Sequence, residues 1–262
     1  MPDLEFRHQD EWEYVAGEFV WTGFDYLGEP DPHSGSGARS SYSGIIDLAG
    51  FPKDRFYLYQ ANWRREHPMV HILPHWTWPG REGQVTPIHV YTTGDSAELY
   101  INDQLVGTQT KGQYDYRLRW DDVTYEPGTV TVVAYKDGEE WATATMETTG
   151  APAAVSLEAD RITVHADGRD LAFVKAAIVD ADGRVVPMAN NSISFAVTGP
   201  GELVATDNGD PMDRTVFGSP SRDAFSGLAL AIVRANGSQS GEITVTATSQ
   251  GLTEAAATLS AE

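Results

Sequence analysis

The sequence predicts a mainly β chain in which two immunoglobulin-like β-sandwiches follow a C-terminal remnant of a (β/α)8 barrel. From residue 70 onward, short alternating runs of β-forming residues are separated by turns such as Asn102-Asp103. All seven Trp and all eleven Tyr precede Gly150, so the chain has at least two parts. Before residue 70, one strand, one long loop and one helix make a single β/α unit, which cannot close a barrel.

Residues 1–66 are expected to form the last β/α unit of an incomplete barrel. Residues 10–16 have the pattern of a helix end, which Gly17 closes because glycine tolerates the positive φ of a helix stop. The run Glu18–Thr22 predicts a strand that leads into a polar, aromatic loop. After a Gly/Ser/Pro-rich stretch, Pro52 opens a second helix, which ends near residue 65.

Two β-sandwiches are expected to follow, over residues 67–150 and 151–262. In the first, short strands alternate with turns, as in an antiparallel sandwich. The stretch from Thr148 to Ala154 has small residues and no periodicity, which indicates a linker. In the second, runs such as Leu171–Val179 alternate with glycine-containing turns, which indicates an immunoglobulin-like domain.

The composition excludes several classes of function. The chain has no cysteine, so disulfides, thiolate nucleophiles and cysteine-bound metals are excluded. Its formal charge of −20 argues against nucleic acid as a partner, because basic residues supply most of that affinity. No apolar run approaches the roughly 20 residues of a membrane span, so we expect a soluble protein without a membrane partner. The compartment is left open: cytoplasm, or periplasm or secretion if a signal precedes this sequence.

Trp21 and Asp25 are the candidate substrate-binding residues. In a barrel, functional residues lie at the C-terminal ends of the strands and in the loops that follow, which is where these two residues fall. An aromatic ring beside a carboxylate suits a sugar, which has C–H faces and hydroxyl edges. The residues alone favour equally a structural interpretation, in which Trp21 packs inside the barrel and Asp25 caps a loop.

Four stretches of the chain resemble one known family. The run Gly17–Pro30 is similar to the eighth-strand segment of β-galactosidases of glycoside hydrolase family 2, and Ser43–Asp54 resembles the next segment of those enzymes. The run His71–Trp78 resembles the sandwich after the barrel, and Gly241–Ala247 resembles the terminal immunoglobulin-like domain. The resemblance therefore spans nearly the whole chain, and it implies a β-galactoside as the carbohydrate partner of the full-length enzyme.

The resemblance also implies a mechanism whose catalytic residues lie elsewhere. These retaining enzymes use two glutamates, about 5–5.5 Å apart, as acid/base and nucleophile. In the family they follow the fourth and seventh strands, upstream of this sequence, so no catalytic residue is assigned here and the chain alone is expected to be inactive. Trp21 would form part of the wall around the cleaved sugar, with Asp25 near it.

Other carboxylates and histidines are expected to be structural. Glu18 and Asp25 lie at opposite ends of the predicted strand, and for Asp25 with Glu29 loop hydrogen bonding is favoured over catalysis. The acidic turn Asp207–Asp210 lacks the later glutamate of an EF-hand, so a tight turn is favoured over a calcium site. The histidines have no zinc-site spacing, so neither a metal nor a cofactor is predicted; they are His67, His71, His75 and His89.

The sequence also allows two functions other than that of an enzyme fragment. One is a carbohydrate-binding module that uses Trp76 and Trp78 as a sugar platform, which requires both rings to be exposed. The other is a structural spacer whose sandwiches set contacts between subunits, and a homo-oligomer is an option that the sequence leaves open.

Overall fold

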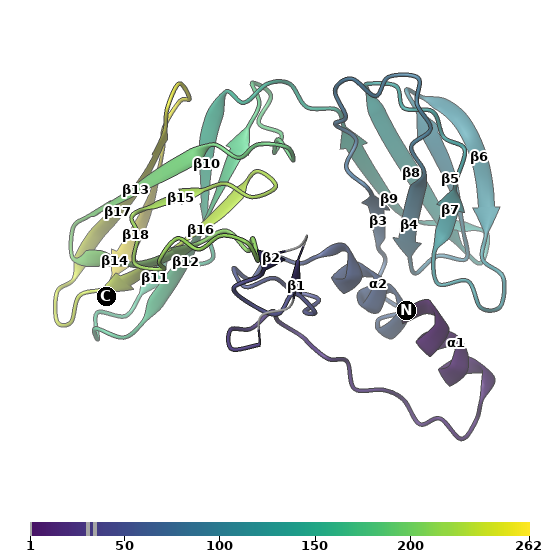
Figure 1. Cartoon of the computed structure of the whole chain (residues 1–262), viewed down its shortest axis with the longest axis horizontal. Coiled ribbons are helices and arrows are strands. Elements are labelled where there is room, and N and C mark those ends of the chain that lie inside the picture. Colours follow the sequence, from purple (N-terminus) through teal and green to yellow (C-terminus); the bar gives the residue numbers. More distant parts are fainter. Residues whose placement is uncertain (1, 30–31, 34–35) are drawn as a thin grey trace. The chain divides into compact units, whose positions relative to one another are not determined.

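The computed structural model describes residues 2–29, 32–33 and 36–262 and divides into two compact units (Figure 1). Unit 1 comprises Met1–Gly23 and Pro52–Thr148, and unit 2 comprises Phe24–Phe51 and Thr149–Glu262. Strands make up most of the regular structure in both units, which confirms the mainly β prediction. None of the helices in the described part of the chain is long and apolar enough to span a lipid bilayer.

Two helices of unit 1 pack against each other through a pair of buried aromatic residues, Phe6 and Tyr59. The helices are α1, Pro2–Glu11, and α2, Asp54–Trp63. The ring of Phe6 lies edge-on to that of Tyr59, with 5.3 Å between centroids, and Phe6 is 1% exposed. The aromatic residues that follow α1 are exposed, so an extension of the helix would have no buried face. The helix therefore ends before the predicted Ala16, because packing supplies most of a helix's stability.

The strand predicted over Glu18–Thr22 is absent from the described structure. Residues 17–20 have no regular structure, and Phe19 is fully exposed. A β-strand is held by hydrogen bonds to a neighbouring strand, and none of the described sheets includes this segment. The segment has the composition of a strand, but in the described structure it has no ladder of hydrogen bonds to a neighbouring strand.

A β-sandwich forms the body of unit 1, with antiparallel sheets of order β3-β4-β7 and β6-β5-β8-β9. Alternate residues face its core: in β5, Ala97, Leu99 and Ile101 are buried and their neighbours are partly exposed. The strands are β3 (Val70–Leu73), β4 (Ile88–Thr92), β5 (Ser96–Ile101), β6 (Gln104–Thr110), β7 (Leu118–Trp120), β8 (Thr129–Lys136) and β9 (Glu139–Glu147).

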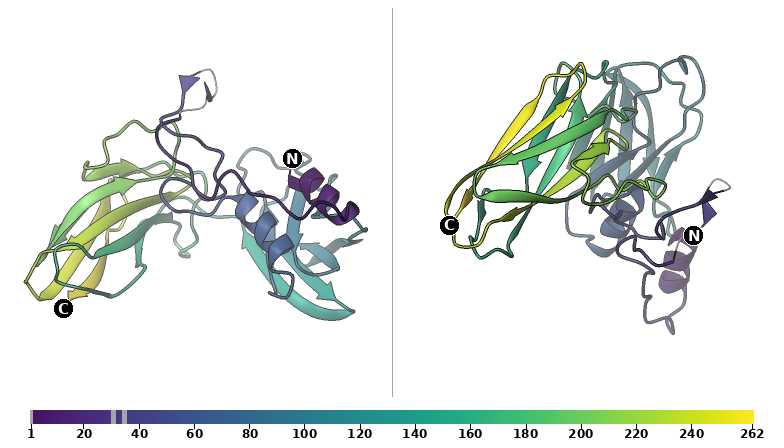
Figure 2. Two further views of the ribbon diagram at one scale, coloured as in Figure 1. Left: turned by 90° about the horizontal axis from the view of Figure 1, so that it is seen from below. Right: turned by 60° about the vertical axis from the view of Figure 1, so that its left-hand side comes forward.

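A second β-sandwich forms the body of unit 2, with sheets of order β10-β12-β16-β14 and β11-β18-β17-β13-β15, which Figure 2 shows from two further sides. Small residues such as Ala176, Ala231 and Val174 fill its core, so few aromatic residues are needed after Gly150. The strands are β10 (Ala154–Ala159), β11 (Thr163–Val164), β12 (Leu171–Val179), β13 (Ser192–Thr198), β14 (Gly201–Asp207), β15 (Ser221–Asp223), β16 (Leu228–Ala235), β17 (Gly241–Ser249) and β18 (Ala255–Ala261).

Residues 24–51 form a long loop of unit 2, called the anchored loop below. Two short strands, β1 (Pro32–His33) and β2 (Ser36–Gly37), pair within it. By its contacts, the loop belongs to the same compact unit as the second sandwich. The sequence instead assigns it to the barrel remnant. The division of the chain at residues 66 and 150 stays a prediction.

Candidate functional site

Trp21 belongs to unit 1 and presents most of its side chain to solvent. Its exposed fraction is 72%, and that of Phe19 is 105%. Both interpretations that the sequence allows, a ring packed inside a barrel and a ring that faces a sugar, stay predictions, because the body of a barrel is not among the described residues. An accessible indole offers the flat apolar face on which the C–H side of a sugar stacks.

Asp25 belongs to unit 2 and is buried, with an exposed fraction of 3%. Its Oδ1 accepts a hydrogen bond from the Gly44 backbone N–H at 2.8 Å, and its own N–H donates to the Ile46 carbonyl at 2.9 Å. A Cβ on Gly44 would lie 2.3 Å from the Asp25 nitrogen, so glycine is required at this close approach. The carboxylate ties the two halves of the anchored loop together.

Glu18 and Glu29, the other candidate carboxylates, interact with neighbours of their own. Glu29 accepts a hydrogen bond from the Tyr26 hydroxyl at 2.7 Å within the anchored loop. Glu18 lies in unit 1, where partial burial and the nearby Glu5 carboxylate raise its pKa. These separate surroundings agree with structural roles for both residues.

A buried ion pair anchors the loop to the sandwich of unit 2. Arg39 Nη2 contacts Asp207 Oδ1, and the two side chains are 11% and 7% exposed. The Arg39 N–H also donates to the Pro211 carbonyl at 2.8 Å. Gly209 has a φ of +74°, and a Cβ there would lie 2.1 Å from an Asp47 carboxylate oxygen. The loop can approach the sandwich this closely only because that position is a glycine.

The acidic turn Asp207–Asp210 is the docking point of the anchored loop. Asp207 Oδ1 accepts the Asn208 N–H at 2.7 Å in addition to the Arg39 contact, and Asp210 Oδ1 accepts the Met212 N–H at 2.8 Å. These oxygen atoms accept hydrogen bonds from donors of the turn and of the docked loop. The arrangement is that of the tight turn that the sequence favours over a calcium site.

A second buried arginine holds the residues that follow this turn. The Arg222 side chain is fully buried and contacts Asp213 Oδ2 at 2.6 Å. It also donates to the carbonyls of Thr206 at 2.6 Å and Val216 at 3.0 Å. Arg222 therefore fixes the loop between β14 and β15 from inside the sandwich.

His71 and His75 serve packing and hydrogen bonding. His71 stacks on Tyr57, with 3.8 Å between ring centroids, and its Nε2 lies 2.8 Å from Asp54 Oδ1. His75 stacks on Trp78 at 4.1 Å, and burial lowers the pKa of His75. Among the residues that the structure describes, no group of three or more His, Cys, Asp or Glu is arranged to hold a metal ion.

The sugar platform considered for Trp76 and Trp78 is wrong. Trp76 is 1% exposed, its ring meets Tyr125 edge-on in the core of unit 1, and its Nε1 donates to the Glu126 carbonyl at 2.9 Å. Trp78 packs partly buried against the same core. A ring enclosed in a core has no open face for a sugar.

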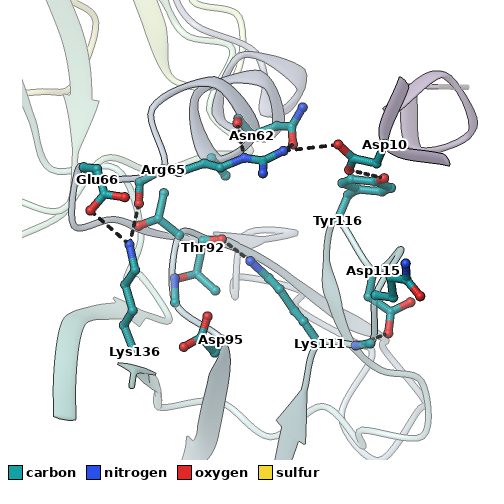
Figure 3. Close-up of a pocket in the computed structure, with 15 residues that line it drawn as sticks. Asp10, Asn62, Arg65, Glu66, Thr92, Asp95, Lys111, Asp115, Tyr116 and Lys136 are labelled. Carbon is teal, nitrogen blue, oxygen red and sulfur yellow. Dashed lines mark hydrogen bonds and ion pairs between the residues drawn. The ribbon is translucent and has the colours of Figure 1, made fainter. Parts of the chain in front are cut away.

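A cavity of about 430 Å³ in unit 1 contains several charged side chains (Figure 3). Lys136 lies 3.3 Å from Glu66, and Arg65 lies 3.5 Å from Asp10. The Lys111 ammonium donates to the Thr92 carbonyl, and its burial lowers the pKa of Lys111 to about 8. Cations and carboxylates largely satisfy one another here, so the cavity presents no concentrated charge of one sign to a ligand.

Comparison with known proteins identifies the family. Residues 155–258 match the model described as "Glycoside hydrolase family 2 C-terminal domain 5", and residues 83–142 match a "Domain of unknown function (DUF4982)". A β-galactosidase of Bacteroides ovatus is 41% identical over 251 residues, which are 95% of this chain and 29% of that protein. The chain belongs to glycoside hydrolase family 2.

Further relatives agree with this assignment of the family 2 chain. A β-glucuronidase of Formosa agariphila is 34% identical over 206 residues, 76% of this chain and 20% of that protein. The crystal structure of a β-glycosidase from Bacteroides vulgatus superposes with a TM-score of 0.91 at 33% identity, over 98% of this chain and 32% of that one. The family 2 chain thus spans about a third or less of the length of these relatives.

These matches confirm the resemblance drawn from the sequence runs. The family 2 chain corresponds to one part of a β-galactosidase, a β-glucuronidase and a β-glycosidase, and one of its matching models is a C-terminal domain of the family. Its relatives act on glycosides, which supports carbohydrate as the class of partner.

Sequence reasoning missed the residues that hold the anchored loop. Arg39 is a single cation within a Gly/Ser-rich stretch of an acidic chain, and that contrast is the one signal that indicates a buried partner. Its partner Asp207 lies 168 residues away, and no sequence spacing connects the two. Arg222 lies in the short strand β15 and Lys111 directly follows β6, and neither residue carries a signal in the sequence.

Proposed function

We propose that this family 2 chain is the C-terminal part of a retaining β-galactosidase-like enzyme, and that residues 1–66 complete its barrel. The observation that carries the proposal is the match of 95% of the chain to a β-galactosidase that is more than three times as long. The two catalytic glutamates of the retaining mechanism would come from the preceding part of that enzyme.

The exposed apolar residues near the start of the chain support a missing barrel body. The exposed fractions are 78% for Tyr14, 105% for Phe19, 72% for Trp21 and 58% for Phe24. A run of exposed apolar residues in one segment of the sequence indicates a surface that another part of a protein covers. The neighbouring strands and helices of a barrel would give Glu18–Thr22 the ladder that it lacks here.

The charges of the sequence segment that contains Trp21 favour a neutral sugar. Residues 17–29 contain three carboxylates, Glu18, Asp25 and Glu29, and no Lys or Arg. A uronic acid is recognised through charge-assisted hydrogen bonds from a cation, which this segment does not supply. We therefore assign a β-galactoside, rather than a β-glucuronide, as the substrate.

The chain would contribute binding and positioning to the reaction, not proton transfer. Trp21 would stack on the apolar face of the sugar that is cleaved. Asp25 would contribute indirectly, because its bond to Gly44 fixes the start of the anchored loop. The Trp21 contact would hold the sugar ring in place while the glutamates of the preceding part act on its anomeric carbon.

The test compares two proteins on nitrophenyl β-galactoside and nitrophenyl β-glucuronide. The chain alone is expected to turn over neither, whereas the polypeptide that continues into the barrel encoded upstream should hydrolyse the galactoside faster. Trp21→Ala in the longer protein should raise KM, and Trp63→Ala, an exposed tryptophan on α2, is the matched control. Turnover by the chain alone, or a preference for the glucuronide, would refute the proposal.

A further inference from the structure

The Lys111 side chain reaches into the cavity of about 430 Å³ in unit 1 (Figure 3). Its nitrogen donates to the backbone carbonyl of Thr92. Within the described part of the chain Lys111 makes no ion pair, although the Asp95 carboxylate favours its charged form from a distance. Burial of an ammonium against a neutral carbonyl is costly, so this cavity favours the uncharged amine.

Lys111 differs in this respect from two other lysines. The chain has four lysines, which are Lys53, Lys111, Lys136 and Lys175. Lys136 Nζ lies 3.3 Å from Glu66 Oε2, and Lys175 Nζ lies 2.5 Å from Glu158 Oε2. Burial lowers the pKa of Lys111 to about 8, so about a quarter of its amine is uncharged at about pH 7.5, against roughly one in a thousand for an ordinary lysine. Lys111 therefore offers a nucleophilic nitrogen near neutral pH.

The rest of the cavity suits a neutral molecule with several hydroxyl groups. Its volume falls within the range of small-ligand pockets, about 300–1,000 Å³. The charged groups that line it beside Lys111 are Asp10, Arg65, Glu66, Asp95, Asp115 and Lys136. They pair largely with one another, as Arg65 does with Asp10 at 3.5 Å. The side-chain amides of Asn62 and Gln113 also line the cavity, and an amide both donates and accepts hydrogen bonds. A hydroxyl group can bind such amides without displacing an ion pair.

An uncharged amine inside a cavity of this kind selects one class of reactant, an aldose in its open-chain form. The amine nitrogen attacks the aldehyde carbon, so that a C–N bond forms while the carbonyl oxygen becomes a hydroxyl. Loss of water then gives a C=N imine, and that water takes the aldehyde oxygen and the two hydrogens of the amine. Nothing is oxidised or reduced, so no further reactant is required. The imine is uncharged, so the reaction removes a charge whose burial is costly.

We propose that Lys111 is a covalent attachment site for an aldose, which binds in the cavity of unit 1 and condenses with the side-chain amine. Binding beside the nitrogen raises the local concentration of the aldehyde and orients it, which speeds the condensation. The site goes beyond the proposed function, because neither the barrel nor the catalytic glutamates take part. Aldoses are the products of glycoside hydrolysis, so the attachment gives such an enzyme a covalent contact with its own product.

The first test incubates the 262-residue chain with D-galactose at about pH 7.5 and adds cyanoborohydride, which reduces the imine to a stable secondary amine. Peptide mass spectrometry then measures the label at each lysine. Lys111 should carry about tenfold more label than Lys136 or Lys175, because more of its amine is uncharged. Lys111→Arg should remove that label and leave the label at the other lysines unchanged. Equal labelling of the three lysines overturns the proposal.

Two further reagents separate binding in the cavity from the reactivity of the amine alone. Formaldehyde needs no cavity, so the ratio of galactose label to formaldehyde label should be higher at Lys111 than at Lys136 or Lys175. Galactitol, the polyol without an aldehyde, should compete for the cavity and slow the galactose labelling of Lys111, while labelling of the N-terminal amine stays constant. Reaction of Lys111 with both aldehydes and no effect of galactitol overturns the aldose site.

A pair of variants tests the lining of the cavity. Asn62→Ala should lower galactose labelling of Lys111 about threefold to tenfold, because a hydrogen-bonding group is lost, and leave formaldehyde labelling unchanged. Gln109→Ala is the matched control, since Gln109 is an exposed residue of β6 that does not line the cavity, and it should change neither. Equal effects of the two variants overturn the site. None of these measurements involves hydrolysis, so an absence of label at Lys111 overturns the site and leaves the proposed function standing.

Discussion

Arg39 and Asp207 form a buried ion pair that joins the anchored loop to the sandwich of unit 2. The two residues lie 168 positions apart, and the loop begins directly after the segment that carries Trp21. The pair makes the immunoglobulin-like domain the support of a loop that the sequence assigns to a barrel. Residues far from one another in the chain therefore shape one part of the candidate site.

Removing one member of this pair should destabilise unit 2 strongly. Arg39→Met leaves the Asp207 charge buried without its cation, which costs about 3–5 kcal/mol in the free energy of unfolding. This loss of stability is measured by urea unfolding, with far-UV circular dichroism as the signal. Arg39→Met with Asp207→Asn should lose less than the sum of the two single changes. Arg234→Met breaks the exposed pair with Glu202 and should cost less than about 1 kcal/mol; an equal cost would contradict the buried role of Arg39.

Gly44→Ala should disrupt the start of the anchored loop. The new Cβ would lie 2.3 Å from the Asp25 nitrogen and 2.6 Å from the Ile46 carbonyl oxygen, so backbone atoms must move. We expect a loss of about 1–3 kcal/mol and faster amide hydrogen exchange at Asp25. Gly218→Ala, where a Cβ meets nothing within 4 Å, is the control in the same unit. Unchanged exchange at Asp25 would show that Gly44 is not a constraint.

Asp180 should make unit 2 less stable in acid. Its carboxylate accepts the N–H groups of Gly150 at 2.8 Å, Arg184 at 2.9 Å and Asp182 at 3.0 Å. Burial alone would raise the pKa of Asp180, but these donors outweigh it and hold the pKa below its ordinary value. Because the pKa is lowered on folding, the stabilisation is present above the unfolded value of about 4 and is lost as the pH falls through the folded value.

Asp180→Asn should therefore lower the free energy of unfolding by about 1–2 kcal/mol at neutral pH. The difference from the natural protein should shrink as the pH falls from about 4 through the folded pKa of Asp180, below which both proteins are neutral at this position. Urea unfolding at several pH values measures it, with Asp182→Asn, whose side chain is 68% exposed, as the control. A difference that stays constant with pH would contradict the charged role of Asp180.

The sequence predicts much of the fold because strand patterns and turns are local. The period-two burial of β5 follows from neighbouring residues alone. The strand over Glu18–Thr22 could not be predicted in the same way, since a strand also needs a partner to pair with. Helix α1 ends early for a similar reason, because its extension has nothing to pack against.

The candidate site is only partly predictable for the same reason. Trp21 stands out by residue type, and its exposure agrees with the sugar-stacking interpretation that we propose. The burial of Asp25 depends on Gly44, 19 residues later, and no local pattern shows that contact. The cavity of unit 1 needs Lys111 and Asn62 together, which only the folded chain supplies.

Lys111→Met should stabilise unit 1 at neutral pH. Burial lowers the pKa of Lys111 from its usual 10.5 to about 8, and the nearby cations Arg65 and Lys136 add to the effect while Asp95 opposes it. The ammonium donates to the Thr92 carbonyl, a neutral acceptor that offsets only part of the lost hydration. A shift of this size corresponds to about 3 kcal/mol of cost, of which we expect methionine to recover about 1–2 kcal/mol.

The sign of the pH dependence separates this mechanism from a simple gain in packing. Between about pH 8 and 10.5 the unfolded chain holds the Lys111 proton and the folded chain does not, so the natural protein becomes more stable as the pH rises. The advantage of Lys111→Met should be largest below about pH 8 and vanish above 10.5. Lys136→Met, which removes the partner of Glu66, should give no such gain. Urea unfolding at about pH 7, 9 and 10.5 tests this, and a constant advantage across that range would attribute the gain to packing alone.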